Sequence, residues 1–145
     1  MLTFSPAEFS DLEVLYDLNR SLIETYEDLA SIDCPKVFAW VRKNLEHTLP
    51  YFTRVYYDGI LVGYYCLSPQ DGKLELDSLF ILPPFQGRDI GTAVLERCIA
   101  ESKQDLMLYV FRRNLGAVKL YQRMGFQIVK ELPTRYIMEY KKQGC

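Results

Sequence analysis

The stretch from Leu79 to Leu95 constrains the fold of this chain more than any other part of the sequence. It holds an apolar run, a Pro-Pro break, a short turn with two glycines and then amphipathic residues, which together predict a strand, a loop and a helix. The start of such a helix presents unpaired backbone N–H groups and the positive end of the helix dipole. The stretch therefore predicts an anion-binding loop, most often a loop for phosphate.

Two common phosphate-binding patterns do not fit this loop. A mononucleotide P-loop requires a Lys-Ser or Lys-Thr pair at a fixed distance after its first glycine, and Gly87 is followed by neither at that distance. The dinucleotide pattern requires three closely spaced glycines at the turn from a strand into a helix, whereas this loop has only Gly87 and Gly91. The loop is therefore neither of these nucleotide-binding types.

The remaining pattern begins at Gln86 and continues as Gly-Arg-Asp-Ile-Gly, with Thr92 and Ala93 opening the helix. It resembles the acetyl-CoA pyrophosphate loop of the GNAT acyltransferase superfamily, in which Gln or Arg is followed by two residues, Gly, one residue, and Gly or Ala. This sequence departs from the family pattern at Asp89, where the family has Gly. Further along the chain, a second set of residues resembles another motif of this family: Asn114, Ala117, Leu120, Tyr121, Gly125 and Phe126.

Apolar residues spaced three and four apart predict four helices. The first is expected to start at Ser5-Pro6, with Glu8 completing a capping box and Phe9 on the buried face, and to run to about Tyr26. The second is expected to place Trp40 in the core. The three later helices are expected at Lys36–Glu46, Asp89–Ser102 and Leu115–Met124.

Alternating apolar residues and turn signals predict seven strands. Asp58-Gly59 supplies the positive φ angles of a tight hairpin turn, and Gly125 is expected to end the last helix. Tyrosines of this hairpin alternate between the two faces, so some are expected in the core and some in a substrate cleft. The strands are expected at Leu2–Phe4, Phe52–Tyr57, Ile60–Leu67, Lys73–Leu82, Leu106–Phe111, Phe126–Lys130 and Thr134–Tyr140.

The predicted element order is β-α-α-β-β-β-α-β-α-β-β, which is similar to the order of the GNAT fold over essentially the whole chain. We therefore expect an α/β fold with one mixed sheet, in a single domain over residues 1–145. By the resemblance, the central parallel strands separate at one end and the cofactor enters the gap. Here these strands are Lys73–Leu82 and Leu106–Phe111.

The resemblance implies acetyl-CoA as co-substrate and assigns mostly backbone roles to the residues that bind it. The strand end at Phe80 and Ile81 is expected to contact the thioester and the pantetheine arm. Asn114 is expected to cap a helix and is a candidate to bond the same arm. The N–H groups expected on the pyrophosphate belong to Gln86, Gly87, Arg88, Asp89, Ile90, Gly91 and Thr92.

Acyl transfer to an amine requires a base for the amine proton and a proton for the departing thiolate. Tyr121 matches the family's tyrosine that can act as general acid, and an ordinary phenol is protonated at neutral pH. Glu75 and Asp77 lie two residues apart on one strand, hence on one face; each is a candidate base, and the alternative is a pair of surface carboxylates. Glu24 and Glu27 are weaker candidates for binding the amine.

Composition argues against several other classes of protein. The chain has 145 residues and a formal net charge of −2, so it has no basic surplus for nucleic acid, and no apolar stretch is long enough to cross a membrane. One histidine and four cysteines without a C-x-x-C pair leave a metal site unsupported. The cysteine pattern and the lack of a leader pattern favour the cytoplasm. A homodimer rests on the resemblance alone.

The resemblance predicts an N-acetyltransferase that passes the acetyl group of acetyl-CoA directly, in a ternary complex, to a primary amine. The acceptor is expected to be a small molecule or a peptide. The alternative is a non-catalytic acyl-CoA-binding or sensing module of the same fold. A third reading is an enzyme of this fold with a longer acyl donor.

Overall fold

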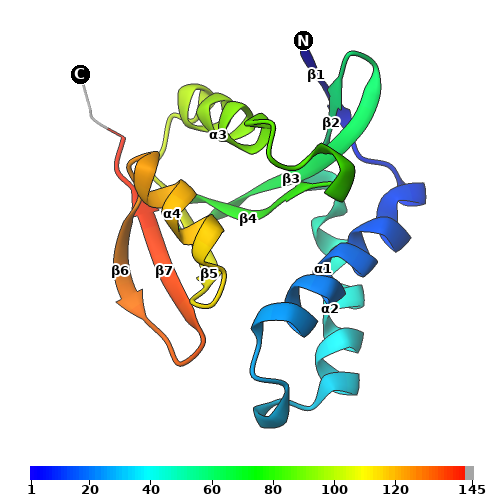
Figure 1. Ribbon diagram of the computed structural model, residues 1–145, viewed down its shortest axis with the longest axis vertical. Helices are drawn as coiled ribbons and strands as arrows, with labels where there is room; N and C mark the ends of the chain where they lie inside the picture. Colours follow the sequence, from blue (N-terminus) through cyan, green and yellow to red (C-terminus); the bar gives the residue numbers. More distant parts are fainter. Residues whose placement is uncertain (143–145) are drawn as a thin grey trace.

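The computed structural model of this protein describes residues 1–142, so the terminal Cys145 lies outside the described residues. The elements follow the predicted order (Figure 1). The strands are β1 (Leu2–Pro6), β2 (Phe52–Tyr57), β3 (Ile60–Gln70), β4 (Lys73–Ile81), β5 (Leu106–Phe111), β6 (Gln127–Glu131) and β7 (Arg135–Tyr140). The helices are α1 (Leu12–Tyr26), α2 (Cys34–Thr48), α3 (Ile90–Glu101) and α4 (Leu115–Arg123), with short 3-10 helices η1 (Phe9–Asp11), η2 (Leu29–Ser31), η3 (Leu49–Tyr51) and η4 (Pro83–Phe85).

The strands form one mixed sheet in the order β1-β2-β3-β4-β5-β7-β6, which confirms the predicted fold class. Every neighbouring pair is antiparallel except β4 and β5, which run parallel. Asp58 and Gly59 join β2 to β3 with φ angles of 49° and 82°, as predicted for a tight hairpin. Asp71 and Gly72 make the next turn with φ angles of 48° and 80°, so β3 extends to Gln70, beyond its predicted end.

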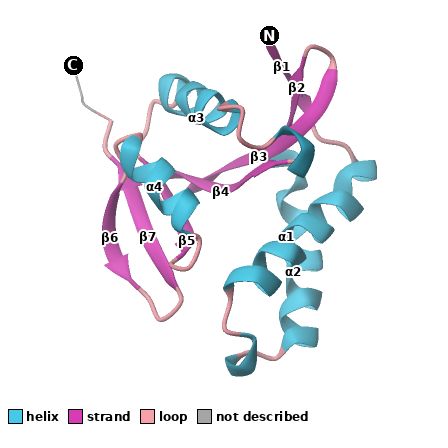
Figure 2. Ribbon diagram, viewed as in Figure 1, coloured by secondary structure: helices cyan, strands magenta, loops and turns pink. Residues whose placement is uncertain are grey.

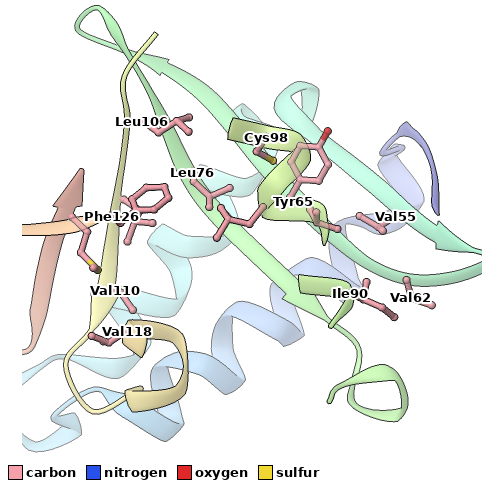
Figure 3. Close-up of a cluster of buried hydrophobic side chains, with 14 residues drawn as sticks. Val55, Val62, Tyr65, Leu76, Ile90, Cys98, Leu106, Val110, Val118 and Phe126 are labelled. Atoms are coloured by element: carbon pink, nitrogen blue, oxygen red, sulfur yellow. The ribbon is translucent and has the colours of Figure 1, made fainter. Parts of the chain in front are cut away.

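Two pairs of helices cover the two faces of the sheet (Figure 2). Helices α3 and α4 pack on one face around a first core that includes Leu76, Leu106 and Val118 (Figure 3). Helices α1 and α2 pack on the opposite face around a second core. The neighbouring residues Tyr64 and Tyr65 belong to the second and the first core respectively, which confirms that the hairpin tyrosines alternate between faces.

The first helix begins later than the sequence predicts. Ser5 and Pro6 belong to β1 and pair with β2. The capping box is formed instead by Glu8 and Asp11, whose carboxylate accepts the Glu8 N–H at 2.7 Å, and η1 leads from there into α1. The helix-start pattern at Ser5-Pro6 is overridden because an edge strand tolerates a proline, which has no N–H to donate.

The Asp11 carboxylate is buried and bound by partners from two strands. The Tyr64 hydroxyl donates to its Oδ1 at 2.7 Å, and the Arg54 Nε donates to its Oδ2 at 2.8 Å. Burial raises the pKa of Asp11, but the hydrogen bonds from Glu8, Arg54 and Tyr64 outweigh burial, so the pKa is lowered. This network ties η1 to β2 and β3.

Two aromatic residues predicted in the core lie at the surface instead. Phe9 is 80% exposed in η1, and Trp40 is 64% exposed in α2. The buried stripe of α2 contains Val41 and Leu45, which are four residues apart. Trp40 precedes Val41 by one residue, about 100° around the helix axis, and therefore falls beside this stripe. The prediction for Trp40 was wrong because apolar spacing alone does not separate the centre of a buried stripe from its flank.

Candidate active site

The predicted anion-binding loop connects β4 to α3 and contains two residues with positive φ. Gly87 has a φ of 79°, and Asp89 has a φ of 60° with a ψ of 17°. Glycine adopts this left-handed conformation freely, and aspartate is one of the few other residues that tolerate it. Asp89 can therefore stand where the family pattern has glycine without changing the path of the backbone. Its exposed side chain makes no capping hydrogen bond to α3.

The loop carries a series of free backbone donors. Within residues 1–142, the N–H groups of residues 87–92 donate to no protein acceptor, and the first bond of α3 runs from the Ala93 N–H to the Asp89 carbonyl at 3.1 Å. Gln86 differs, because its N–H donates to the Pro83 carbonyl at 3.3 Å and its side-chain amide to the Ile81 carbonyl at 2.9 Å. Successive free donors at the positive end of a helix fit a diphosphate.

Two loop side chains are engaged away from Asp89. The Arg88 guanidinium lies over the Phe85 ring, 5.9 Å from its centroid, and the described residues contain no ion pair between Arg88 and Asp89. The Thr92 hydroxyl oxygen accepts a bond from Arg123 of α4 at 3.5 Å. Ile90 is buried in the first core and anchors the start of α3.

The parallel strands β4 and β5 are paired only at their beginnings. Leu74 is opposite Leu106 and Glu75 is opposite Met107, and no register continues beyond these residues although both strands do. The pair therefore separates, as the resemblance predicts. On the face covered by α1 and α2, a pocket of about 470 Å³ lies at this separation.

A β-bulge shapes the β4 wall of this pocket. Asp77 has no partner on β3, because Cys66 pairs with Ser78 and Leu67 pairs with Leu76. The extra residue shifts the alternation of β4, because Leu76 before it and Leu79 after it both pack in the first core. Asp77 and Ser78 line the pocket. Glu75, two residues earlier, lines it as well.

The Glu75 and Asp77 carboxylates share the pocket without a cationic partner among the described residues. Burial raises the pKa of Glu75 and the nearby Asp77 raises it further, partly offset by the Gln70 amide, which donates to Glu75 Oε1 at 3.3 Å. Burial also raises the pKa of Asp77. The Asp77 side chain lines the pocket and stays exposed to solvent in the free protein. Each carboxylate is therefore a stronger base than an ordinary surface carboxylate.

Tyr121, in α4, lines the same pocket. Burial raises the pKa of Tyr121 to about 12, and the nearby Cys98 adds to this shift. The Tyr121 ring also packs against Phe126, with centroids 5.6 Å apart. The phenol is thus protonated at neutral pH and is held by the first core.

Asn114 caps α4 as predicted, because its Oδ1 accepts the Ala117 N–H at 3.3 Å, and it also lines the pocket. Phe80 lines the pocket, whereas Ile81 packs in the first core. The end of β4 lies unusually close to β3 here, since a Cβ on Gly63 would stand 2.1 Å from the Phe80 carbonyl oxygen. Only glycine permits this approach.

The sequence did not identify several residues that line the pocket. Trp40, Asn44 and Thr48 form a stripe of α2 with a spacing of four residues, and this periodicity is the signal that could have revealed them. Tyr109 of β5 and Arg135 of β7 also line the pocket, and no motif marks Tyr109.

The weaker amine-binding candidates are engaged elsewhere. Glu24 pairs with Arg20 at 3.5 Å, and the Glu27 Oε1 accepts the Asp28 N–H at 3.1 Å. Neither lines the pocket, and none of the tyrosines of the β2–β3 hairpin does.

The remaining predictions concern cysteines, metals and membranes. Cys66 and Cys98 are buried, and Cys34 is the first residue of α2. Among residues 1–142, no three His, Cys, Asp or Glu side chains are grouped so that they could hold a metal ion. No helix in this part of the chain has the length and apolar character needed to cross a bilayer.

Known proteins resemble this chain in sequence and in fold. Spermine/spermidine N(1)-acetyltransferase of Bacillus subtilis (strain 168) is 30% identical over 139 residues, covering 84% of this chain and 90% of that protein. Peptidyl-lysine N-acetyltransferase YiaC of Escherichia coli (strain K12) is 33% identical over 90 residues, covering 57% of this chain and 58% of YiaC. The crystal structure of PaiA N-acetyltransferase from Thermoplasma acidophilum in complex with coenzyme A has the same fold, with a TM-score of 0.73, 21% identity and coverage of 98% and 99%.

The sequence profile of the acetyltransferase (GNAT) family matches residues 12–126, which include the loop, both candidate bases and Tyr121. The family profile, the similar sequences and the shared fold all indicate the same family. The chain therefore belongs to the acetyltransferase (GNAT) family and is an acetyl-CoA-dependent N-acyltransferase.

Proposed function

We propose that this protein transfers the acetyl group of acetyl-CoA to a primary aliphatic amine by direct attack in a ternary complex. The observation that carries this proposal is the meeting of Glu75, Asp77 and Tyr121 in one pocket, where β4 and β5 separate. Bound acetyl-CoA would supply the acyl group as an activated thioester.

In this proposal the backbone binds the cofactor. The free N–H groups of residues 87–92 hold the diphosphate at the start of α3. The end of β4, at Phe80 and Ile81, lies along the pantetheine arm, and Asn114 lies beside it. Gly63 preserves the close packing of β3 on this strand end.

Side chains of the pocket handle the protons. An aliphatic amine is protonated at neutral pH and must lose a proton before its nitrogen can attack a carbonyl carbon. Glu75 or Asp77 takes this proton, directly or through a water molecule, while the N–C bond forms and the C–S bond breaks. Tyr121 holds the proton that the departing sulfur receives.

The acceptor we propose is an amine of a small molecule or a peptide. The Bacillus subtilis relative is named for polyamines and YiaC for peptidyl-lysine, and both acceptors are aliphatic primary amines. The two carboxylates attract an ammonium group, and the exposed Trp40 adds an aromatic face to the lining of the same pocket. A cytoplasmic location and a homodimer stay predictions.

A panel of primary amines, scored by release of free CoA from acetyl-CoA, tests the proposal. We expect turnover with at least one amine, and we expect Tyr121→Phe to reduce it strongly while leaving CoA binding intact. Tight CoA binding without turnover on any amine would favour the non-catalytic module. Mass spectrometry of the ligand that co-purifies tests the third alternative. An acyl group longer than acetyl on that ligand would indicate that the enzyme uses a longer acyl donor.

The loop offers a separate test of cofactor binding. Asp89 brings a carboxylate near the proposed diphosphate site, where two negative charges repel each other. We expect Asp89→Gly to bind acetyl-CoA as tightly as the natural protein or more tightly, measured by calorimetry. A large loss of affinity in this variant would show that Asp89 contributes to binding.

A further inference from the structure

The pocket contains one cation whose role the proposed reaction does not explain. Arg135, the first residue of β7, lines the pocket together with Glu75 and Asp77. These three are the charged side chains that line it within the described part of the chain. A fixed cation in a site for a cationic amine repels the acceptor unless the acceptor also carries a negative group.

Arg135 is exposed, and its guanidinium lies against a neighbouring ring without being neutralised. It lies over the ring of Tyr109, 5.4 Å from the centroid, and Tyr109 lines the same pocket. Among residues 1–142 no carboxylate lies within 4.0 Å of it and no hydrogen bond uses its donors. Its donors are therefore available to a ligand, and a guanidinium matches the two oxygens of a carboxylate.

The sheet keeps Arg135 apart from the pocket carboxylates. Arg135 is opposite Phe111 on β5, while Glu75 and Asp77 belong to β4 on the other side of β5. The two groups are also offset along the strands, because Met107, opposite Glu75, pairs with Glu139, four residues after Arg135. Positive and negative charges thus stand on different walls of one pocket.

We infer that the acceptor is an amino-carboxylate, with its amine toward Glu75 and Asp77 and its carboxylate bound by Arg135. This inference rests on the proposed function and narrows its acceptor to molecules that carry both charges at opposite ends of a short chain. Arg135 is then a specificity-determining residue, and its loss weakens recognition of the carboxylate without removing the chemistry.

Three acceptors of equal length separate the effect of charge from that of size: 5-aminopentanoate, pentylamine and cadaverine. They share a five-carbon chain and a terminal amine, and end in a carboxylate, a methyl group or a second ammonium. We expect kcat/KM to be highest for 5-aminopentanoate. Arg135→Gln should lower it about 10- to 100-fold for this acceptor, through KM, and should leave kcat/KM for pentylamine the same or higher, because a repelling cation is removed. Arg135→Glu should shift the preference to cadaverine.

Arg112 provides the matched control. Its guanidinium also lies over a tyrosine ring, that of Tyr136 at 5.2 Å, but it does not line the pocket. Arg112→Gln should keep the order of the three acceptors. Equal or better use of cadaverine by the natural protein, or an equal loss for pentylamine and 5-aminopentanoate in Arg135→Gln, would overturn the inference.

A binding measurement separates this inference from the proposed function. The products 5-acetamidopentanoate and N-pentylacetamide have no amine left to react, so calorimetry reports their binding without turnover. Tighter binding of the carboxylate product that is lost in Arg135→Gln supports the inference even if no amine releases CoA. Turnover without any carboxylate preference, in binding or in kinetics, leaves the proposed function standing and refutes the inference.

Discussion

Two sites in this protein hold carboxylates whose pKa values are displaced in opposite directions. At Asp11, three hydrogen-bond donors outweigh burial and lower the pKa. At Glu75 and Asp77, burial prevails and raises the pKa of both groups, because no cation forms an ion pair with them among the described residues. The first site is satisfied by the fold itself. The second is left for a ligand, which is the mark of a functional rather than a structural carboxylate.

We expect the largest effect in acetyl-transfer activity, when Glu75 and Asp77 are replaced. Replacing both candidate bases, as Glu75→Gln with Asp77→Asn, removes every carboxylate that lines the pocket among the described residues. We expect kcat for acetyl transfer to fall by about 10²- to 10⁴-fold, as for loss of a general base. The unfolding free energy should stay the same or rise, since neutral amides carry no desolvated charge. A loss of about 3–5 kcal/mol in unfolding free energy, as for breaking a buried ion pair, would make the two carboxylates structural instead.

The next largest effect is expected in stability at the first site. Asp11→Asn leaves the Arg54 guanidinium without its carboxylate partner at 2.8 Å. Breaking such a buried pair costs about 3–5 kcal/mol in unfolding free energy, which chemical denaturation can measure. The matched control is Glu13→Gln, which breaks an exposed pair with Arg42 and should cost less than about 1 kcal/mol. Similar losses in the two variants would contradict the structural role of Asp11.

A smaller effect is expected in the pH dependence of stability. The lowered pKa of Asp11 means that its contribution is present above about pH 4, near the unfolded value, and is lost as the pH falls through the folded pKa. The raised pKa values of Glu75 and Asp77 act in reverse: their contribution is full below about pH 4 and is lost as the pH rises through the folded pKa.

Unfolding curves from pH 3 to pH 7 can therefore distinguish the two sites. Relative to the natural protein, the Glu75→Gln, Asp77→Asn variant should gain stability as the pH rises above about 4. The loss of unfolding free energy in Asp11→Asn, relative to the natural protein, should shrink as the pH falls below about 4. Parallel curves for all three proteins would remove the distinction between the sites.

The order of elements and the cofactor loop could be predicted because their signals are local. Asp58-Gly59 and Gly87 stand where the backbone requires positive φ. Capping by Asn114 is likewise visible in a few adjacent residues. The start of the first helix was mispredicted because pairing of Ser5 and Pro6 with β2 is a long-range interaction that no local pattern records.

The pocket could be predicted only in part, because side chains from separate elements build it. Glu75 and Asp77 were identified from their strand, but the bulge beside them was not. The sequence records the bulge only as a change in the alternation of apolar residues. The core-facing residues are Leu74 and Leu76 before the bulge and Leu79 and Ile81 after it. Trp40, Tyr109 and Arg135 meet there only in the folded chain.

The central claim is that Glu75 and Asp77 are unsatisfied by the fold and Asp11 is satisfied. Titration of the side-chain carboxyl carbons by NMR, without ligand, measures all three pKa values in one sample. We predict that Glu75 and Asp77 titrate above the ordinary values of about 4.3 and 3.9 and that Asp11 titrates below 3.9. Ordinary or lowered pKa values for Glu75 and Asp77 would contradict the account.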